Sequence, residues 1–219
     1  MIWLIGVAHA TELISLPIFN LDREGTVPQA YSGLLLLWAA GAAFAAARLG
    51  TEPQRALYAL AAVFGFMSLD EVFRIHETLD DALDFDWQVL YLPIVAAAVA
   101  GWVRVARSLA REGRLRVAWI GGAACWGIAQ VLEAFQWDGR VRPGTIHWEQ
   151  LTDAQIEQKL TEPAYLAMML PEELLEMCGS LLFALVLSAL LASVVVALDL
   201  RGRERDAVIH GRFVDRSGE

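Results

Sequence analysis

The sequence contains little of the chemistry that cross-links small secreted domains or that binds nucleic acid. Only two cysteines occur in 219 residues, Cys125 and Cys178, and both lie inside apolar segments. This excludes a disulfide framework and indicates two small, buried hydrophobic side chains. No nucleic-acid-binding motif is present, so we expect no nucleic-acid partner. No cationic region precedes the apolar first twenty residues, which favours a spanning helix over a cleaved signal peptide.

What the chain has instead is apolar surface. Hydrophobic residues make up 57% of the sequence and the mean hydropathy is +0.45, which is too apolar for an ordinary soluble domain. Six apolar segments are long enough to cross about 30 Å of hydrocarbon, and they cover residues 2–19, 30–49, 56–77, 87–106, 116–137 and 165–198. We therefore predict an all-α fold, a six-helix transmembrane bundle. The sixth segment is too long for one perpendicular span, so we expect Pro171 to split off an interfacial turn.

Basic residues mark alternate ends of the predicted helices. The outer connections, including a long loop at 138–164, hold eleven acidic residues against four basic ones. By the positive-inside rule, both termini are cytoplasmic and the acidic connections face outward from a bacterial inner membrane. Residues 1–200 form one transmembrane domain, and we expect the polar cytoplasmic tail, 201–219, to be loosely ordered. Twelve arginines define the cytoplasmic side: Arg48, Arg55, Arg104, Arg107, Arg111, Arg114, Arg116, Arg201, Arg203, Arg205, Arg212 and Arg216.

One stretch, residues 68–77 with the sequence SLDEVFRIHE, concentrates ionisable groups at membrane depth. Each such group costs about 2.5–3.5 kcal/mol on insertion scales, so a functional site is the default interpretation. On a regular helix Asp70, Arg74 and Glu77 share one face, with Glu71 beside them, and His76 points nearly opposite Asp70. The structural alternative is an ion-pair knot, although Arg74 balances only one of the three carboxylates.

Further carboxylates fall at the same predicted depth in other helices. Glu12 lies in the first segment. Trp126, Gln130, Glu133 and Trp137 follow a helical stripe in the fifth segment. The sixth segment opens with three glutamates, after which a glycine, Gly179, allows a close approach by a neighbouring backbone or ligand. We expect all of these groups to face one outer pocket. The glutamates of the sixth segment are Glu172, Glu173 and Glu176.

Eight carboxylates beside one arginine cannot all stay ionised in a pocket of low dielectric constant. A bound divalent metal ion, shared protons or a structural network must offset their charge. The chain lacks the Glu-x-x-His pairs of four-helix di-metal proteins, and its oxygen-rich set favours Mg²⁺, Ca²⁺ or Mn²⁺, with Zn²⁺ possible through histidine. The candidate metal ligands are Glu12, Asp70, Glu77, Glu133, Glu172, Glu173 and Glu176.

The leading hypothesis is a metal-dependent hydrolase of a lipid or envelope substrate, in which the cation polarises the substrate and activates a water. His76 or Glu71 would act as the catalytic general base. Two alternatives stay open. One is a cation-binding transport or sensing protein. The inner half of every segment lacks charge, which counts against this alternative. The other is an accessory membrane subunit whose carboxylates are structural. Whether the protein is an enzyme is therefore undecided at this stage.

Three motifs resemble those of a group of uncharacterised bacterial multipass membrane proteins. They are Asn20-Leu-Asp-Arg-Glu-Gly followed by Pro28 and Ser32, Ser68-Leu-Asp-Glu followed by His76-Glu77, and Glu172-Glu173 followed by Glu176 and Gly179. The resemblance covers most of the chain and implies that Asp22, Glu24 and Ser32 belong to the same outer site. It implies no activity. Glu133-Ala-Phe-Gln136, Gly139-Arg140 and Glu176 are also similar to VanZ-like membrane proteins, although the long insert before Glu172 departs from that pattern.

Overall fold

The computed structural model describes residues 27–73, 75, 79, 87–137 and 163–216, and every element in these ranges is helical. Five of the helices are long and apolar enough to cross a membrane, which confirms an all-helical chain suited to several membrane crossings. The predicted helix at 2–19 lies outside the described residues, and the cytoplasmic placement of both termini stays a prediction. The elements are α2 (Val27–Arg48), α3 (Gln54–Phe73), α5 (Trp87–Ser108), the 3-10 helix η2 (Leu109–Arg111), α6 (Gly113–Trp137) and α8 (Pro163–Arg216).

Helix α2 offers a continuous buried face on which α3 and α8 both pack. Small side chains line that face, because Ala39, Ala43 and Ala46 have no exposed surface, and small residues let helix backbones approach closely. The opposite face exposes large apolar side chains such as Trp38 and Phe44. A helix that is apolar on all sides in this way is typical of a membrane span.

Helix α2 ends in a cap that turns the chain back along itself. Gly50 has a φ angle of +83°, a left-handed conformation that glycine adopts without steric cost. The Thr51 amide donates to the Ala46 carbonyl at 3.1 Å, and the Gly50 amide donates to the Ala47 carbonyl at 3.0 Å. These two bonds are those of a Schellman motif. Helix α3 therefore returns antiparallel to α2, so that the end of α3 lies beside the start of α2.

Aromatic side chains connect the other helices into the same core. The ring of Phe183 on α8 lies 5.3 Å from that of Phe64 on α3 and 4.9 Å from that of Trp119 on α6, measured between centroids. Trp119 is fully buried and exchanges hydrogen bonds with Trp102 of α5. Each indole N–H donates to the carbonyl of the other residue, at 3.1 and 3.2 Å.

Helix α8 is continuous across Pro171, so the expected separation of an interfacial turn at this residue is wrong. Proline removes one backbone donor and breaks helices in water. In a membrane segment, however, any other backbone conformation would leave more polar groups unpaired, so a helix tolerates proline there. Pro93 lies inside α5 in the same way.

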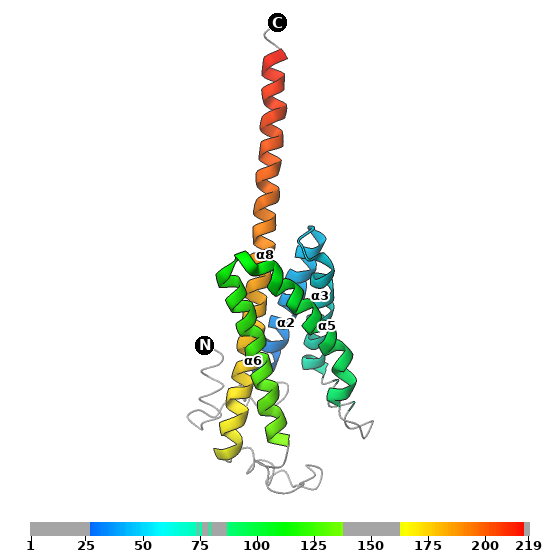
Figure 1. Ribbon diagram of the computed structural model, residues 1–219, viewed down its shortest axis with the longest axis vertical. Coiled ribbons are helices and arrows are strands. Elements are labelled where there is room, and N and C mark those ends of the chain that lie inside the picture. The colour runs from blue at the N-terminus through cyan, green and yellow to red at the C-terminus, as the bar shows by residue number, and fades with distance from the viewer. Residues whose placement is uncertain (1–26, 74, 76–78, 80–86, 138–162, 217–219) are drawn as a thin grey trace.

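Helix α8 also continues to Arg216, so the expectation of a loosely ordered tail from residue 201 is wrong over most of that tail. Extending an existing helix adds one hydrogen bond per residue without a new nucleation cost. With 54 residues, α8 is about 80 Å long. Its C-terminal part projects well beyond the other helices (Figure 1).

Candidate functional site

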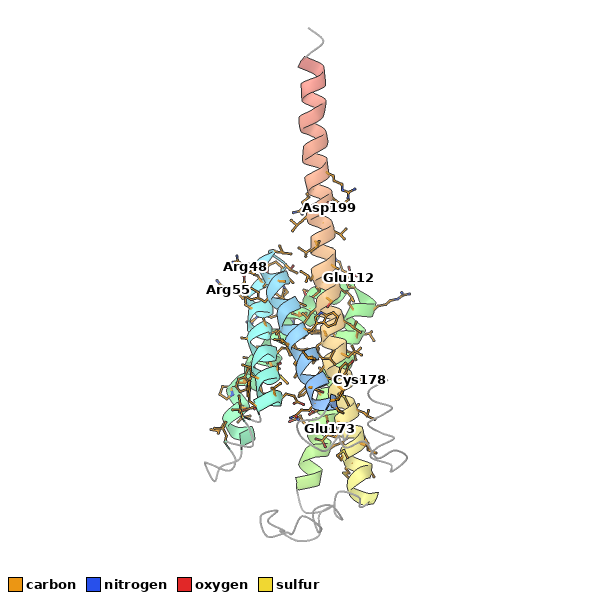
Figure 2. All side chains as sticks on the ribbon, turned by 180° about the vertical axis from the view of Figure 1, so that it is seen from behind. Arg48, Arg55, Glu112, Glu173, Cys178 and Asp199 are labelled. Atoms are coloured by element: carbon orange, nitrogen blue, oxygen red, sulfur yellow. The ribbon has the colours of Figure 1, made fainter. Side chains whose placement is uncertain are left out.

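Polar side chains gather at one end of the bundle, where α2 and α5 begin, α3 and α6 end, and the early part of α8 lies. We term this the polar end. Figure 2 shows Glu173 at the polar end and Arg48, Arg55 and Glu112 at the opposite one, termed the arginine end. Five carboxylates at the polar end are half-buried: Asp70, Glu71, Glu172, Glu173 and Glu176.

The first part of the polar end is the contact between α2 and α3. The Ser68 hydroxyl, which is buried, donates to the Gly33 carbonyl at 2.8 Å. The Gln29 side-chain amide donates to the backbone carbonyl of Glu71, also at 2.8 Å. A Cβ placed on Gly33 would lie 3.1 Å from the side chain of Val72 and 3.8 Å from Cγ of Glu71. The side chain of Glu71 therefore lies against the start of α2.

Asp70 faces α5 instead. The Tyr91 hydroxyl donates a hydrogen bond of 2.8 Å to Oδ1 of Asp70, and both side chains are half-buried. A hydrogen bond to a charged group contributes more than a neutral one when it is shielded from water. Tyr91 also packs edge-to-face on Phe66, with ring centroids 5.3 Å apart. The Asp70–Tyr91 pair thus fixes one carboxylate between α3 and α5.

The third part of the polar end is the contact between α6 and α8. The Gln130 side-chain amide donates to Oε1 of Glu176 at 3.2 Å, and the Trp126 indole N–H donates to the Ser180 hydroxyl at 3.2 Å. Gly179 allows this close contact, because a Cβ there would lie 2.4 Å from Cδ1 of Trp126. The expected close approach of a neighbour at Gly179 is therefore present, and the neighbour is α6.

The structure brings the predicted carboxylates to one end but divides them between two contacts. Asp70 and Glu71 lie on α3, which packs on α2 and α5, whereas the glutamates of α8 lie where that helix packs on α2 and α6. Within the described ranges, no three histidine, cysteine, aspartate or glutamate side chains are grouped so that they could hold one metal ion. The predicted single pocket is thus represented here by two polar groups beside α2.

Several predicted residues lie outside this description. Glu12, His76 and Glu77 are among the residues that the structure does not describe, as are Asp22 and Glu24. Glu133 lies on α6, with its side chain outside the description. Ser32 is described, and it is buried on α2.

Sequence reasoning missed two polar residues at this end, Gln29 and Tyr91. The position of each residue along its predicted span would have indicated both. Each lies near the start of a span, and that start is on the same side of the membrane as Asp70.

These observations define a class: over its described residues the protein is helical, with five helices fit to cross a membrane and a polar, carboxylate-rich end. The chain belongs to a family defined as a domain of unknown function (DUF8692), whose model matches residues 4–191. That match fits the expected uncharacterised family, while the three motifs and the VanZ-like similarity stay predictions. No curated protein and no solved structure matches the chain. The matched region ends within α8, before its C-terminal projection.

Proposed function

We propose that this is a multi-pass protein of the bacterial inner membrane that binds a divalent metal ion at the polar end and hydrolyses a lipid or envelope substrate. One observation carries the proposal. Half-buried carboxylates from α3 and α8 lie at the same end of the bundle, while the arginines that the structure describes lie elsewhere. Packing such groups together is costly unless a cation or a proton offsets their charge.

The described carboxylates suit an oxygen-preferring ion better than zinc. A catalytic zinc site usually includes histidine or cysteine ligands, whereas the half-buried side chains of the polar end that the structure describes offer carboxylate oxygens. Mg²⁺ is usually held by one or two carboxylates together with water and the phosphate oxygens of a substrate. We therefore favour Mg²⁺, Mn²⁺ or Ca²⁺ over Zn²⁺, and a substrate that carries a phosphate group.

Each described residue then has a role in the proposal. Glu172 and Glu176 are ligands, and Gln130 orients Glu176 through its side-chain amide. Asp70, oriented by the Tyr91 hydroxyl, adds negative charge at the same end, which attracts the cation. Glu71 is the general base, with His76, outside the described residues, as the alternative. A bound cation would polarise the substrate oxygen and make a bound water more acidic.

The first test measures metal. The full chain is purified without chelator, its metal content is determined by elemental mass spectrometry, and the metal-free protein is titrated with Mg²⁺, Mn²⁺, Ca²⁺ and Zn²⁺. We expect binding in the parent and loss of binding when Glu172→Gln and Glu176→Gln are combined. Glu112→Gln is the matched control, because Glu112 is exposed at the arginine end. Equal binding by the double variant and the control would contradict the proposal.

The second test asks for chemistry. The protein is reconstituted into vesicles of a total bacterial lipid extract with Mg²⁺ or Mn²⁺, and the lipids are followed by mass spectrometry. We expect a phosphate-bearing lipid to be lost and its hydrolysis product to accumulate, and Glu71→Gln to stop the reaction. Metal binding without any hydrolysis would support the transport or sensing alternative instead.

Two hydrogen bonds favour a second candidate function, a structural network in an accessory subunit. Asp70 and Glu176 each accept a bond from a neutral side chain on a neighbouring helix, which is how such a network ties helices together.

Asp70→Asn in chelator separates the two candidates. In a cation site, removing one charge relieves repulsion and leaves the metal-free melting temperature unchanged or raised, while the stabilisation on adding metal shrinks. That stabilisation is about 2.7 kcal/mol at a hundredfold excess over Kd. In a structural network, the same change replaces a charge-assisted hydrogen bond from Tyr91 by a neutral one, so the melting temperature falls by the same amount with or without metal.

A further inference from the structure

The contact between α6 and α8 also contains both cysteines of the chain. Cys125 on α6 and Cys178 on α8 are free thiols, and each is half-buried. Cys125 lies three residues from Gly122 and Cys178 lies next to Gly179, and these two glycines meet where α6 packs against α8. The two cysteines therefore lie at the same level of the helix contact, near enough to influence each other electrostatically. The expectation of two unrelated buried hydrophobic side chains therefore gives way to a thiol pair, contributed by helices that the sequence separates by more than fifty residues.

The backbones of α6 and α8 approach each other closely beside the two cysteines. A Cβ on Gly179 would lie 2.9 Å from the Gly122 carbonyl oxygen, and a Cβ on Gly122 would lie 3.3 Å from the Gly179 carbonyl oxygen. Helix backbones thus touch directly beside the two cysteines, whereas ordinary helix pairs keep their axes about 8–10 Å apart. A disulfide needs Cα atoms about 4.4–6.8 Å apart, and only such a close crossing of helices offers that separation.

We propose that Cys125 and Cys178 form a reversible dithiol–disulfide site that joins α6 to α8 covalently beside the polar end. Helices α6 and α8 are antiparallel, so contacts that come later on α6 involve earlier residues of α8, and the two cysteines fit this order. The pair lies between the Gly122–Gly179 contact and the hydrogen bond from Gln130 to Glu176. Oxidation therefore fixes the separation of the two helices close to Glu176, and reduction releases it. This inference goes beyond the proposed function and does not depend on metal binding.

The oxidant is a small disulfide. The thiolate of one cysteine attacks a sulfur of the oxidant, forming a mixed disulfide and releasing one small thiol. The thiolate of the second cysteine then attacks the sulfur of the first, forming the Cys125–Cys178 bond and releasing the second small thiol. Two electrons and two protons pass from the protein to the oxidant, which leaves as two thiols.

The test equilibrates the full chain in buffers with increasing ratios of hydroxyethyl disulfide to 2-mercaptoethanol. This disulfide is small and uncharged, so it reaches half-buried thiols inside the helical bundle. Remaining thiols are then counted with a maleimide, and the intact mass is measured. We expect both thiols to disappear together, with a mass decrease of two hydrogen atoms and no dimer.

The matched control moves one thiol by a single residue. Ala124→Cys combined with Cys125→Ala keeps two cysteines but turns one of them about 100° around α6, toward the exposed position of Ala124. We expect this variant to gain mass through mixed disulfides, and its internal bond, if any, to need an oxidant ratio about tenfold higher or more. The single variant Cys125→Ser should take up one reagent molecule.

Three outcomes would overturn the proposal. One is a parent chain that takes up reagent on both cysteines or stays reduced at every ratio. Another is a bond between two chains in place of the internal one. The last is an internal disulfide in the moved-thiol variant that forms as readily as in the parent.

Discussion

The two ends of the bundle both carry charge, but they hold it in different surroundings. At the arginine end the charged side chains of both signs are exposed, from Arg48 and Arg55 to Glu52 and Glu112. At the polar end the five described carboxylates are half-buried and lie on helices that pack against neighbours. Exposed charge is solvated and costs little, whereas half-buried charge has lost part of its hydration. The comparison separates exposed, solvated charges at one end from half-buried charges at the other.

The contact between α6 and α8 is tightly packed. A Cβ on Gly179 or Gly122 would meet neighbouring atoms within 3.0 Å, but one on Gly113 at the arginine end would meet nothing within 4 Å. The exposed salt bridge between Arg203 and Asp199, at 3.0 Å, is of a kind that contributes little to stability. Perturbations at the contact between α6 and α8 should therefore cost more than matched perturbations at open positions such as Gly113.

The largest expected effect is an all-or-none difference in labelling between the two ends. In a chain lacking both native cysteines, we expect a cysteine at Gly113 to be inaccessible to an impermeant thiol reagent added outside intact cells. A cysteine in the 145–160 loop, outside the described residues, should react. The physical basis is the arginine asymmetry, from which we predict that the arginine end lies in the cytoplasm.

Labelling at Gly113 and protection of the loop would reverse the comparison, because the polar end would then face the cytoplasm. Permeabilised cells provide the control, since both positions must react there if the variants are folded and reactive.

The next effect in size concerns packing. Gly179→Ala places a methyl group 2.4 Å from Cδ1 of Trp126 and 2.9 Å from the Gly122 carbonyl. Overpacking of this kind costs about 1–3 kcal/mol, more than the gain of up to about 1 kcal/mol from replacing glycine in a helix. We expect a lower melting temperature of the detergent-solubilised protein.

Two controls sharpen this prediction. Gly113→Ala at the arginine end and Gly127→Ala on α6 both add a methyl group where no atom lies within 4 Å, so neither should destabilise the protein. A melting temperature for Gly179→Ala equal to that of the controls would show that the contact between α6 and α8 adjusts freely.

The sequence predicted the spans well because hydrophobicity alone decides them. The segment predicted at 116–137 forms α6, Gly113–Trp137, and the one predicted at 30–49 forms α2, Val27–Arg48. Continuity of the helix across Pro171 could not be predicted. It depends on whether the backbone groups of a non-helical turn would find hydrogen-bond partners among the surrounding helices and lipid. The helical extension to Arg216 was missed because local polarity was taken as a sign of disorder.

The candidate site was predictable in depth but not in grouping. Counting residues along each span brings Asp70 and Glu176 to the same end, as the structure shows. Which side chains meet depends on which helices are neighbours, and α2 packs against both α3 and α8. Asp70 therefore bonds to Tyr91, and Glu176 bonds to Gln130. Periodicity within one helix carries no information about such partners in other helices.

The smallest expected effect tests whether half-burial strengthens a single polar bond. Tyr91→Phe removes the hydroxyl that donates to Asp70 at 2.8 Å and leaves the ring that packs on Phe66. A typical hydrogen bond contributes about 0.5–1.5 kcal/mol and one to a charged group somewhat more, and water partly screens this half-buried pair, so we expect a small fall in melting temperature. Asp199→Asn, which weakens the exposed bond to Arg203, should change it little or not at all. Equal effects of the two variants would mean that Asp70 is as well solvated as the exposed Asp199. Half-burial would then not strengthen the polar interactions at this end.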